Sequence, residues 1–454
     1  MDKGSLITFE EAMKCSRAES YDCFSHYVNP AEASLLKMAD MDRRYTRASG
    51  IFLYDDSGRE YMDFTAGYGA LNLGHNPPEV LKAVEEARTL PAVLLAGYNP
   101  LMGALAKNLS KLLPGNLSVT SFGSGGAEAV ETAMKTALAS TRRRKFVSST
   151  NAYHGQTLGA ISLCMNERNV EALGISACES QSVPFGNLEA LEQRLKSKDV
   201  AGFIVEPVQG EGGAVVPPKG YLKKAEELCR NYGTLLILDE IQTGFGRTGK
   251  LFAMEHEHVQ PDIVTLSKSL GAGVVPISVS VTTPEIWKNA FGTRDRFDMV
   301  VNTFGGNPAA CAAAMKSIEI TLREKLPERA AELGDYAMKR LQEMKEKHKH
   351  VKEIRGQGLL LGVALEPPKI PGGNMKENLS AMMITRLLDK HGILTSFYDL
   401  DPTVIRFEPP LTVTKEQLDK ALDAYDEVLG KGLAGLGLGF AKKMIGRAVS
   451  TRSG

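Results

Sequence analysis

Two charged residues each follow a short apolar run in the middle of the chain. Residues 235–238 (LLIL) lead into Asp239, and residues 263–266 (IVTL) lead through one serine into Lys268. Unbroken runs of this length and composition are typical of parallel strands that are buried on both faces. In open α/β sheets, ligands bind beyond the carboxyl ends of such strands. We therefore expect Asp239 and Lys268 to face one ligand.

A carboxylate and an amine at one site have two interpretations. An arbitrary Asp and Lys most often form a structural ion pair. The alternative is pyridoxal phosphate (PLP) chemistry, in which a lysine forms a Schiff base with the cofactor and an aspartate keeps its pyridinium nitrogen protonated. The residues that flank the two positions decide between these interpretations.

The flanking residues resemble those of a known enzyme family. The segments LDEIQTGFGRTGK and PDIVTLSKSLGAG are similar to the corresponding segments of class III (ω-) aminotransferases, and the resemblance extends over residues 27–430. It implies an α/β fold, the fold-type I of PLP-dependent transferases (aspartate aminotransferase-like), with a mostly parallel seven-stranded sheet in a large domain and a smaller α+β C-terminal domain. It also implies that Lys268 is the catalytic Schiff-base lysine, that Asp239 is the catalytic partner of the ring nitrogen, and that Gln242 neighbours the ring hydroxyl.

A glycine-rich turn provides a candidate phosphate site. Ser124, Gly125, Gly126 and Ala127 lie between the strand-like VTSF and a predicted helix. Small residues allow a close backbone approach, and the first amides of a helix favour an anion. Together with Lys268, this turn is predicted to hold the cofactor phosphate. Ser124 and Gly125 depart from the usual Asn-Ser-Gly-Thr/Ala order of the family, so backbone amides are expected to make the contact.

Four further cofactor-binding residues follow from the resemblance. Tyr153 is expected to stack on the pyridine ring, as a flat aromatic side chain can, and His154 to support the site from behind. Glu206, in VEPVQGEGG, belongs with them. Thr303, in TFGGNP, is expected to reach the phosphate of the neighbouring subunit's PLP. The resemblance therefore implies shared active sites and at least a homodimer.

Arg406, in VIRFEPPLT, and Glu211 are predicted to act as a switch between substrates. A planar guanidinium binds a carboxylate through two parallel hydrogen bonds. By resemblance, Arg406 binds the α-carboxylate of glutamate or 2-oxoglutarate, and Glu211 neutralises it when a substrate without that carboxylate is bound. An ordinary structural salt bridge is the alternative. Tyr68, in the loop TAGYGA, is predicted to contact the substrate.

Within the class, the chain resembles the putrescine (diamine) type most. The stretches that carry this likeness are VPFGNLEAL, PPKGYLKKAEELC, EHEHVQPDIVTLSK and VIRFEPPLTVTKEQL. The implied reaction is an ω-transaminase reaction: ping-pong transfer of a terminal amino group from a diamine or ω-amine to 2-oxoglutarate or a similar 2-oxo acid, through pyridoxamine phosphate. The apolar stretches 65–70 and 94–100 leave an alternative, an aminotransferase for a hydrophobic or long-chain aldehyde or acyl substrate in secondary metabolism.

Two other classes are weaker. A PLP-dependent mutase or racemase would have less need of Arg406 and Glu211. A non-catalytic relative would have lost Lys268 or Asp239, and both are present.

The surrounding elements fit this interpretation. Strand-like and helical runs alternate from residue 100 to 310, which predicts a mostly parallel sheet covered by helices. The strands are predicted over 146–149, 203–206, 235–238 and 263–266, and the helices over 125–139, 187–196, 219–231 and 307–324. A hairpin is predicted within 51–64, a helix after Pro30, and strands over 359–363 and 404–407. The predicted segments are an N-terminal arm and hairpin (1–72), a large PLP-binding domain (73–318), a small domain (319–430) and a Gly-rich basic tail (431–454).

Composition argues against several other classes of protein. Lys+Arg and Asp+Glu both number 54, so no global charge points to nucleic acid. The N-terminal residues lack the apolar core of a signal peptide, and no apolar stretch is long enough to cross a bilayer. The six cysteines are scattered, which fits reduced thiols and predicts a cytoplasmic enzyme. The tail is interpreted as a frayed terminus in preference to a membrane anchor.

Two short histidine motifs were weighed as metal sites. They are His256-Glu257-His258 and His348-Lys349-His350, and neither has further ligands at suitable spacing. Both are predicted to be solvated surface, so no metal is expected.

Overall fold

The computed structural model describes residues 6–39, 41–93, 95–164, 173, 179–366, 384–386 and 388–431. Its central feature is a seven-stranded sheet in the order β4-β10-β9-β8-β7-β5-β6. Strand β10 is antiparallel to both of its neighbours, and the other strand pairs are parallel. The predicted mostly parallel seven-stranded sheet is confirmed. The strands are β4 (Val119–Gly123), β5 (Lys145–Ser149), β6 (Glu179–Val183), β7 (Val200–Val205), β8 (Leu235–Asp239), β9 (Ile263–Leu266) and β10 (Ser278–Thr282).

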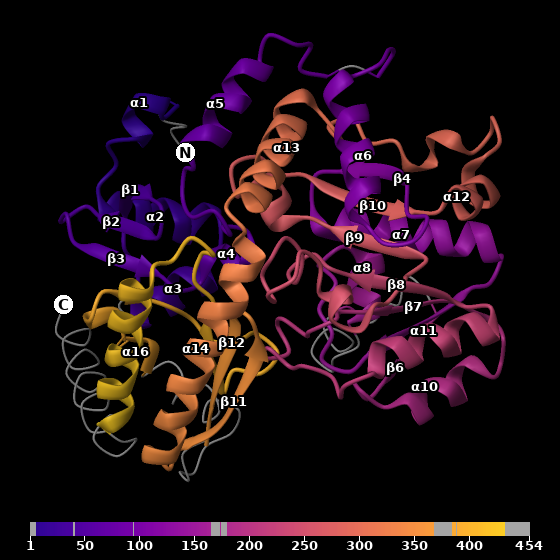
Figure 1. Ribbon diagram of the computed structural model, residues 1–454. Helices are drawn as coiled ribbons and strands as arrows, with labels where there is room; N and C mark the ends of the chain where they lie inside the picture. Colours follow the sequence, from indigo (N-terminus) through magenta and orange to yellow (C-terminus); the bar gives the residue numbers. More distant parts are fainter. Residues whose placement is uncertain are drawn as a thin grey trace.

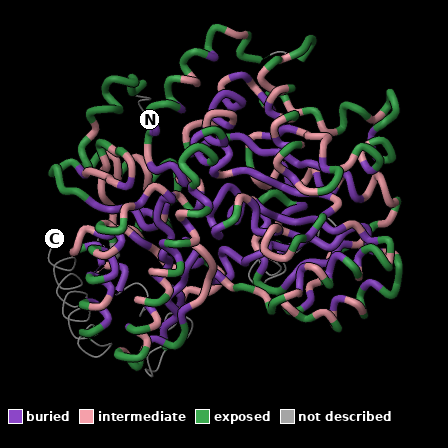
Figure 2. Tube along the Cα trace, in the orientation of Figure 1, coloured by how far each residue is buried: buried purple, intermediate pink, exposed green. Residues whose placement is uncertain are grey.

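The central strands are buried on both faces because alternate residues enter two different cores. Leu236 and Leu238 of β8 pack in one core, whereas Ile237 between them packs in the other. The first core is completed by α6 (Pro100–Leu112), α10 (Leu188–Leu195) and α11 (Tyr221–Tyr232). The second is completed by α7 (Gly126–Thr141) and α8 (Leu158–Leu163). Figures 1 and 2 show the buried sheet with helices around it. This double cover explains why the strands read as continuous apolar runs.

The C-terminal elements form a smaller layer with the N-terminal hairpin. Its antiparallel three-stranded sheet contains β11 (Val351–Gln357), β12 (Leu360–Leu365) and β14 (Val404–Phe407), beside α14 (Leu326–Lys347) and α16 (Lys415–Gly430). A four-stranded sheet contains β1 (Tyr45–Ser49), β2 (Phe52–Asp55), β3 (Glu60–Asp63) and β13 (Ile393–Leu394). Because β13 pairs with β3, a C-terminal segment of the chain lies beside the N-terminal hairpin.

We propose the predicted division of the chain, 1–72, 73–318 and 319–430, for the folded protein as well. One core cluster joins Met62 and Phe64 of the hairpin region to Phe407 and Tyr425, which supports an N-terminal segment packed on the small domain. The predicted tail, 431–454, lies outside the described residues except for Lys431.

The remaining helices are α1 (Phe9–Ala12), α2 (Arg17–Tyr27), α3 (Pro30–Ala39), α4 (Ala66–Gly69), α5 (Pro78–Ala87), α12 (Pro284–Phe291), α13 (Pro308–Arg323) and the 3₁₀ turns η1 (Ala253–Glu257), η2 (Lys268–Gly271) and η3 (Phe297–Val300).

The prediction that both histidine motifs are solvated surface is wrong for His256 and His348, whereas His258 and Lys349 are exposed. His256 is half-buried, and its Nε2 lies 3.2 Å from Oγ1 and 3.1 Å from the carbonyl oxygen of Thr248. His348 Nε2 lies 2.6 Å from the carboxylate of Asp426. Both rings therefore serve local packing and hydrogen bonding. No group of three metal-binding side chains occurs among the described residues, and none of the described helices has the length and apolar character needed to cross a bilayer.

Candidate active site

Asp239 is the last residue of β8 and lies among polar neighbours at the carboxyl end of the sheet. Its Oδ2 accepts a hydrogen bond from His154 Nδ1 at 2.7 Å. Its Oδ1 accepts from Thr265 Oγ1 and from the backbone N–H of Ile241, both at 3.1 Å. The register of β8 and β9 places Asp239 directly opposite Thr265. The strand pairing therefore positions and orients this carboxylate.

Lys268 begins the turn η2 just beyond β9. Its backbone has a φ of 47°, in the left-handed region that non-glycine residues rarely adopt. Its Nζ donates a hydrogen bond to Gln242 Oε1 at 3.0 Å. Burial lowers the pKa of Lys268, although the nearby carboxylates of Glu211 and Glu408 act in the opposite direction. A lowered pKa increases the fraction of neutral, nucleophilic amine.

Tyr153, His154 and Glu206 follow β5 and β7 at the same end of the sheet. Glu206 accepts hydrogen bonds from the backbone N–H groups of Tyr153 (3.0 Å) and Gly210 (2.9 Å). Burial raises the pKa of Glu206 to about 7. Burial alone would lower the pKa of His154, but its hydrogen bond to Asp239 outweighs burial, so the pKa is raised. The structure thus brings the predicted residues His154, Glu206 and Asp239 together.

The start of α7 contains two amides that no acceptor occupies. The N–H groups of Ser124 and Gly125 donate to Oε2 of Glu128, at 2.7 and 2.9 Å. Those of Gly126 and Ala127 donate to no acceptor within the described part of the chain. Amides at the N-terminus of a 16-residue helix suit an anion. Of the four residues predicted for the phosphate, Gly126 and Ala127 therefore have free donors.

Gly126 also faces a close neighbour. A Cβ at this position would lie 3.1 Å from Cδ1 of Ile241, whereas a Cβ at Gly125 would meet nothing within 4 Å. A side chain at Gly126 would consequently crowd the segment that follows Asp239.

Thr303 is exposed in the single chain. Its loop is attached to the start of α7, because Asn302 Nδ2 donates to Oε1 of Glu128 at 2.7 Å. A Cβ on Gly305 would lie 2.4 Å from the carbonyl oxygen of Phe122, so the loop backbone packs directly on β4. Among the predicted cofactor-binding residues, Thr303 and Gly125 are therefore the two that the single chain leaves exposed.

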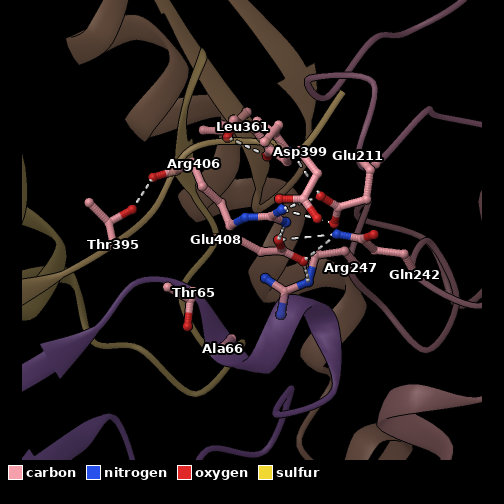
Figure 3. Close-up of polar contacts among 12 residues, drawn as sticks. Thr65, Ala66, Glu211, Gln242, Arg247, Leu361, Thr395, Asp399, Arg406 and Glu408 are labelled. Atoms are coloured by element: carbon pink, nitrogen blue, oxygen red, sulfur yellow. Dashed lines mark hydrogen bonds and ion pairs between the residues drawn. The ribbon is translucent and has the colours of Figure 1, made fainter. Parts of the chain in front are cut away.

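Arg406 lies at the centre of a buried polar cluster (Figure 3). Its Nη2 donates to both carboxylate oxygens of Glu211, at 2.8 and 2.9 Å. The ring centroids of Tyr398 and Tyr68 lie 4.0 and 4.6 Å from its Cζ. Burial alone would raise the pKa of Glu211, but the charge of Arg406 lowers it by a larger amount. The pKa of Glu211 therefore lies below its usual value. The structure therefore brings together all three predicted substrate-binding residues, Arg406, Glu211 and Tyr68.

Sequence reasoning missed two members of this cluster, Glu408 and Arg247. Glu408 Oε2 accepts from Arg406 Nη1 at 2.7 Å, and Gln242 Nε2 lies 3.2 Å from both Glu408 oxygens. Arg247 Nε lies 3.8 Å from Glu408 Oε1. A signal for Glu408 was available, because residues two apart along a strand share a face. Arg406 and Glu408 have that spacing at the end of β14.

Arg247 is held mainly by main-chain oxygens. Its Nη1 donates to the carbonyl oxygens of Leu359 (3.0 Å) and Pro409 (2.6 Å), and its Nη2 donates to Asn72 Oδ1 (2.6 Å). Arg247 therefore ties the loop after β8 to the small domain.

Comparison with known proteins reveals related sequences over nearly the whole chain. The family model described as aminotransferase class-III matches residues 37–429. A putrescine aminotransferase of Pectobacterium atrosepticum is 38% identical over 434 residues, which cover 92% of this chain and 90% of that protein. Aminotransferase PigE of a Serratia species is 35% identical over 455 residues, which cover 91% of this chain but only 53% of PigE. The chain thus spans about half the length of that relative.

Solved structures give the same result. An ornithine aminotransferase from Toxoplasma gondii, crystallised with partial occupancy of PLP at its active site, has a TM-score of 0.82 at 32% identity and covers 93% of this chain and 96% of its own. An (S)-enantioselective ω-transaminase from Thermomicrobium roseum has a TM-score of 0.81 at 32% identity and covers 92% and 99%.

Proposed function

The chain belongs to the PLP-dependent class III aminotransferases, and from this premise we propose that it transfers the terminal amino group of a diamine or other ω-amine to 2-oxoglutarate or a similar 2-oxo acid. The observation that carries the proposal is the buried pair of Arg406 with Glu211. An arginine at an active site binds a substrate carboxylate well, and an internal carboxylate that covers it allows the same site to accept an amine without one.

The described residues fit PLP. The free amides of Gly126 and Ala127 would hold its phosphate, with Ser124 and Gly125 beside them. Asp239 would lie at the ring nitrogen, and Lys268 would bond to the aldehyde carbon. When bound, PLP supplies an aldehyde that receives the amine and a ring that withdraws electrons from the neighbouring carbon.

Tyr153, His154, Glu206 and Gln242 complete the proposed binding site. Tyr153 would cover one face of the ring, and Gln242 would neighbour its hydroxyl. His154 holds the carboxylate of Asp239 in place, and Glu206 ties the turn at Tyr153 to the turn at Gly210.

Lys268 is proposed to move the proton during transfer. Its lowered pKa allows a neutral Nζ to take a proton from the substrate carbon that bears the amine and, within the same half-reaction, to pass it on to the cofactor side. In the other half-reaction the lysine would carry out the same transfer in the opposite direction. The hydrogen bond from Nζ to Gln242 Oε1 orients this amine. The hydrogen bonds that Thr265, His154 and the N–H of Ile241 donate to Asp239 would hold its carboxylate in place at the ring nitrogen.

Arg406 and Glu211 are proposed to alternate between the two half-reactions. While the amine is bound, Glu211 stays on Arg406 and neutralises it. When the 2-oxo acid enters, its α-carboxylate takes the place of Glu211, and one negative charge replaces another. Tyr68, whose ring lies over Arg406, is proposed to contact the substrate at this point.

A second candidate is an aminotransferase for hydrophobic substrates. Leu95 is 65% exposed and Tyr98 is 100% exposed, so apolar side chains are available in the stretch 94–100, of which Leu94 lies outside the described residues. Such a surface would favour a long alkyl chain over a second charged amine.

One experiment separates the two candidates. The PLP-loaded enzyme would be mixed with putrescine, cadaverine, ornithine or a medium-chain alkylamine in the absence of a 2-oxo acid, and the loss of the cofactor absorbance band would be followed. We expect fast loss with diamines and recovery on addition of 2-oxoglutarate. Fast loss with alkylamines alone, with putrescine inert, would support the second candidate instead.

We also propose a homodimer with shared sites. Phe297, Met299, Val301 and Phe304 expose between 50% and 61% of their surface beside Thr303, an apolar surface that a second subunit would cover. A cytoplasmic location is proposed because Cys15, Cys23, Cys229 and Cys311 are free thiols. Light scattering of the purified enzyme would test the dimer.

A further inference from the structure

We propose that Glu408 is a specificity-determining and positioning residue that stays on Arg406 through both half-reactions, so that only Glu211 is exchanged for a substrate carboxylate. This inference rests on the proposed amine transfer and adds to it a fixed second carboxylate. It also gives Glu408 an effect on Lys268, through Gln242.

The first argument is the way in which Arg406 is surrounded. Its Nη1 donates to Glu408, its Nη2 donates to Glu211, and its Nε is buried with no hydrogen-bond partner among the described residues. The rings of Tyr398 and Tyr68 lie close to the guanidinium (Figure 3 shows its two carboxylate partners). A substrate carboxylate can therefore bind only by displacing one of the two glutamates. The unpartnered Nε is available as its second donor, next to Nη2.

The second argument identifies which glutamate leaves. Glu408 is held by Arg406, by Gln242 Nε2 and by the nearby charge of Arg247, and its backbone N–H donates to the carbonyl oxygen of Phe64. Besides Arg406, the side chain of Glu211 has one long hydrogen bond, 3.3 Å from the N–H of Asp399. Each side chain accepts three hydrogen bonds, but only Glu408 also lies beside a second arginine, and its side chain is fully buried whereas that of Glu211 is 7% exposed. If Arg406 turns to a substrate carboxylate, Glu211 keeps only its long bond to Asp399, so Glu211 is the one that leaves.

The third argument is the charge of the cluster. Arg406 and Arg247 carry two positive charges, and Glu211 and Glu408 carry two negative charges. If Glu408 stays, the departure of Glu211 leaves one uncompensated positive charge, which one substrate carboxylate neutralises. The site would thus select acceptors with a single carboxylate at this end, adjacent to the reacting carbonyl. An amine donor without that carboxylate leaves the cluster unchanged.

The fourth argument connects Glu408 to the reactive amine. A glutamine side chain can present either its oxygen or its nitrogen to a neighbour. Because Glu408 can only accept from Gln242, the amide nitrogen faces Glu408 and the oxygen faces Lys268 Nζ, 3.0 Å away. Glu408 therefore fixes the orientation of the group that holds the lysine.

The test uses Glu408→Gln in the PLP-loaded enzyme, with Glu226→Gln as the matched control. Glu226 is also a buried carboxylate that accepts from an arginine Nη2, that of Arg230, but it lies on α11 away from the site. Two readouts need no turnover. They are the pH midpoint of the cofactor absorbance band and the affinity for glutarate, a dicarboxylate without a reacting carbonyl.

We expect Glu408→Gln to lower the pH midpoint by about half to one unit, since a negative charge near Lys268 is lost. Its glutarate affinity should rise about threefold to tenfold, because an anion then enters a more positive site. Glu226→Gln should match the wild type in both. Unchanged values in Glu408→Gln, or equal changes in Glu226→Gln, would overturn the inference.

Glu408→Asp provides a second route if Glu408→Gln does not fold. It keeps the charge that neutralises the two buried arginines but shortens the side chain. We expect a pH midpoint close to that of the wild type and a slower reaction with 2-oxoglutarate, and an unchanged rate would contradict the inference. If the wild type fails to use ω-amines but the glutarate and pH results hold, the proposed function is wrong and the role of Glu408 stands.

Discussion

Two of the regions that contain buried carboxylates differ in what keeps these groups in place. At the strand ends of the large sheet, Glu206 and Glu240 pair with no arginine or lysine of the described residues, and burial raises the pKa of each to about 7. In the arginine cluster (Arg406, Arg247, Glu211 and Glu408), the charge of Arg406 holds the pKa of Glu211 below its usual value. Glu206 and Glu240 are thus held mostly by hydrogen bonds from backbone N–H groups, whereas the carboxylates of the cluster are held by arginine charges.

This difference matches the two proposed tasks. A group whose position follows from strand register, as Asp239 does opposite Thr265, cannot move without breaking the sheet. A group held by an ion pair can be exchanged for another anion, because the incoming charge replaces the one that leaves. The proposed catalytic residues therefore lie at the strand ends, where they are held in place, and the proposed exchange of carboxylates takes place in the cluster.

The largest effect is expected at the strand ends, from Lys268→Ala. Without the amine, no side chain can bond to the cofactor or move the proton, so amine transfer should fall about a thousandfold or more. The absorbance band of covalently held cofactor should also disappear. The measurement is the spectrum of the purified variant after addition of PLP, together with its transfer rate. A retained band would show that another residue carries the reaction.

The next effect is expected in the cluster, from Arg406→Lys. The variant keeps a buried positive charge for Glu211 and Glu408 but loses the planar fork that binds a carboxylate. The reaction with 2-oxoglutarate should slow by about a hundredfold, since a buried charged hydrogen bond contributes about 3 kcal/mol. The amine half-reaction should stay within about twofold of the wild type. Single-turnover rates for each half-reaction test this, and equal losses in both would remove the distinction between the regions.

A smaller effect on stability is expected from Glu240→Gln, a change outside the reacting groups. Glu240 is buried and accepts hydrogen bonds from Thr243 Oγ1 and from the N–H groups of Ala253 and Met254. Its pKa is about 7 when folded, above the usual 4.5, so the folded state binds the extra proton. Stability should therefore fall as pH rises from about 4.5 to about 7.

The variant lacks this titration. We expect the wild type to lose about 2 to 3 kcal/mol more than Glu240→Gln between pH 5 and pH 8, as measured by urea unfolding. Parallel curves for the two proteins would mean that Glu240 is ionised in the folded state, like the cluster carboxylates.

The smallest effect is expected at the start of α7. Gly126→Ala places a methyl group 3.1 Å from Ile241 Cδ1, whereas Gly125→Ala places one in open space. We expect Gly126→Ala to weaken PLP retention by about threefold to tenfold, and Gly125→Ala to change it by less than about twofold. Equilibrium titration with PLP compares them. Equal losses would indicate that the phosphate lies nearer Gly125.

The sequence predicted the strand ends better than the cluster. Strands β7, β8 and β9 are apolar throughout, so their ends, and with them Asp239 and Lys268, were visible in the sequence. Strands β6 and β10 were missed. β6 (ESQSV) is a polar strand at the edge of the sheet. β10 (SVSVT) is buried, but its serines and threonine give it a composition that is also common in loops.

Glu408 was missed for a different reason. The cluster brings residue 211 from the loop after β7, residue 247 from the loop after β8, and residues 406 and 408 from β14 and its end. No local pattern records contacts between such distant segments. Only the pair of Arg406 with Glu211 was predicted, and that came from family resemblance.

The backbone of Lys268 has a consequence for the history of this chain. A non-glycine residue at a φ of 47° destabilises the fold by about 1 kcal/mol, and burying its amine adds to that strain. Selection for stability alone would therefore favour glycine at position 268. A variant with that glycine would be more stable to heat but would lose the proposed amine transfer. If Lys268 carries the proposed transfer, selection for turnover would retain the lysine against this cost in stability.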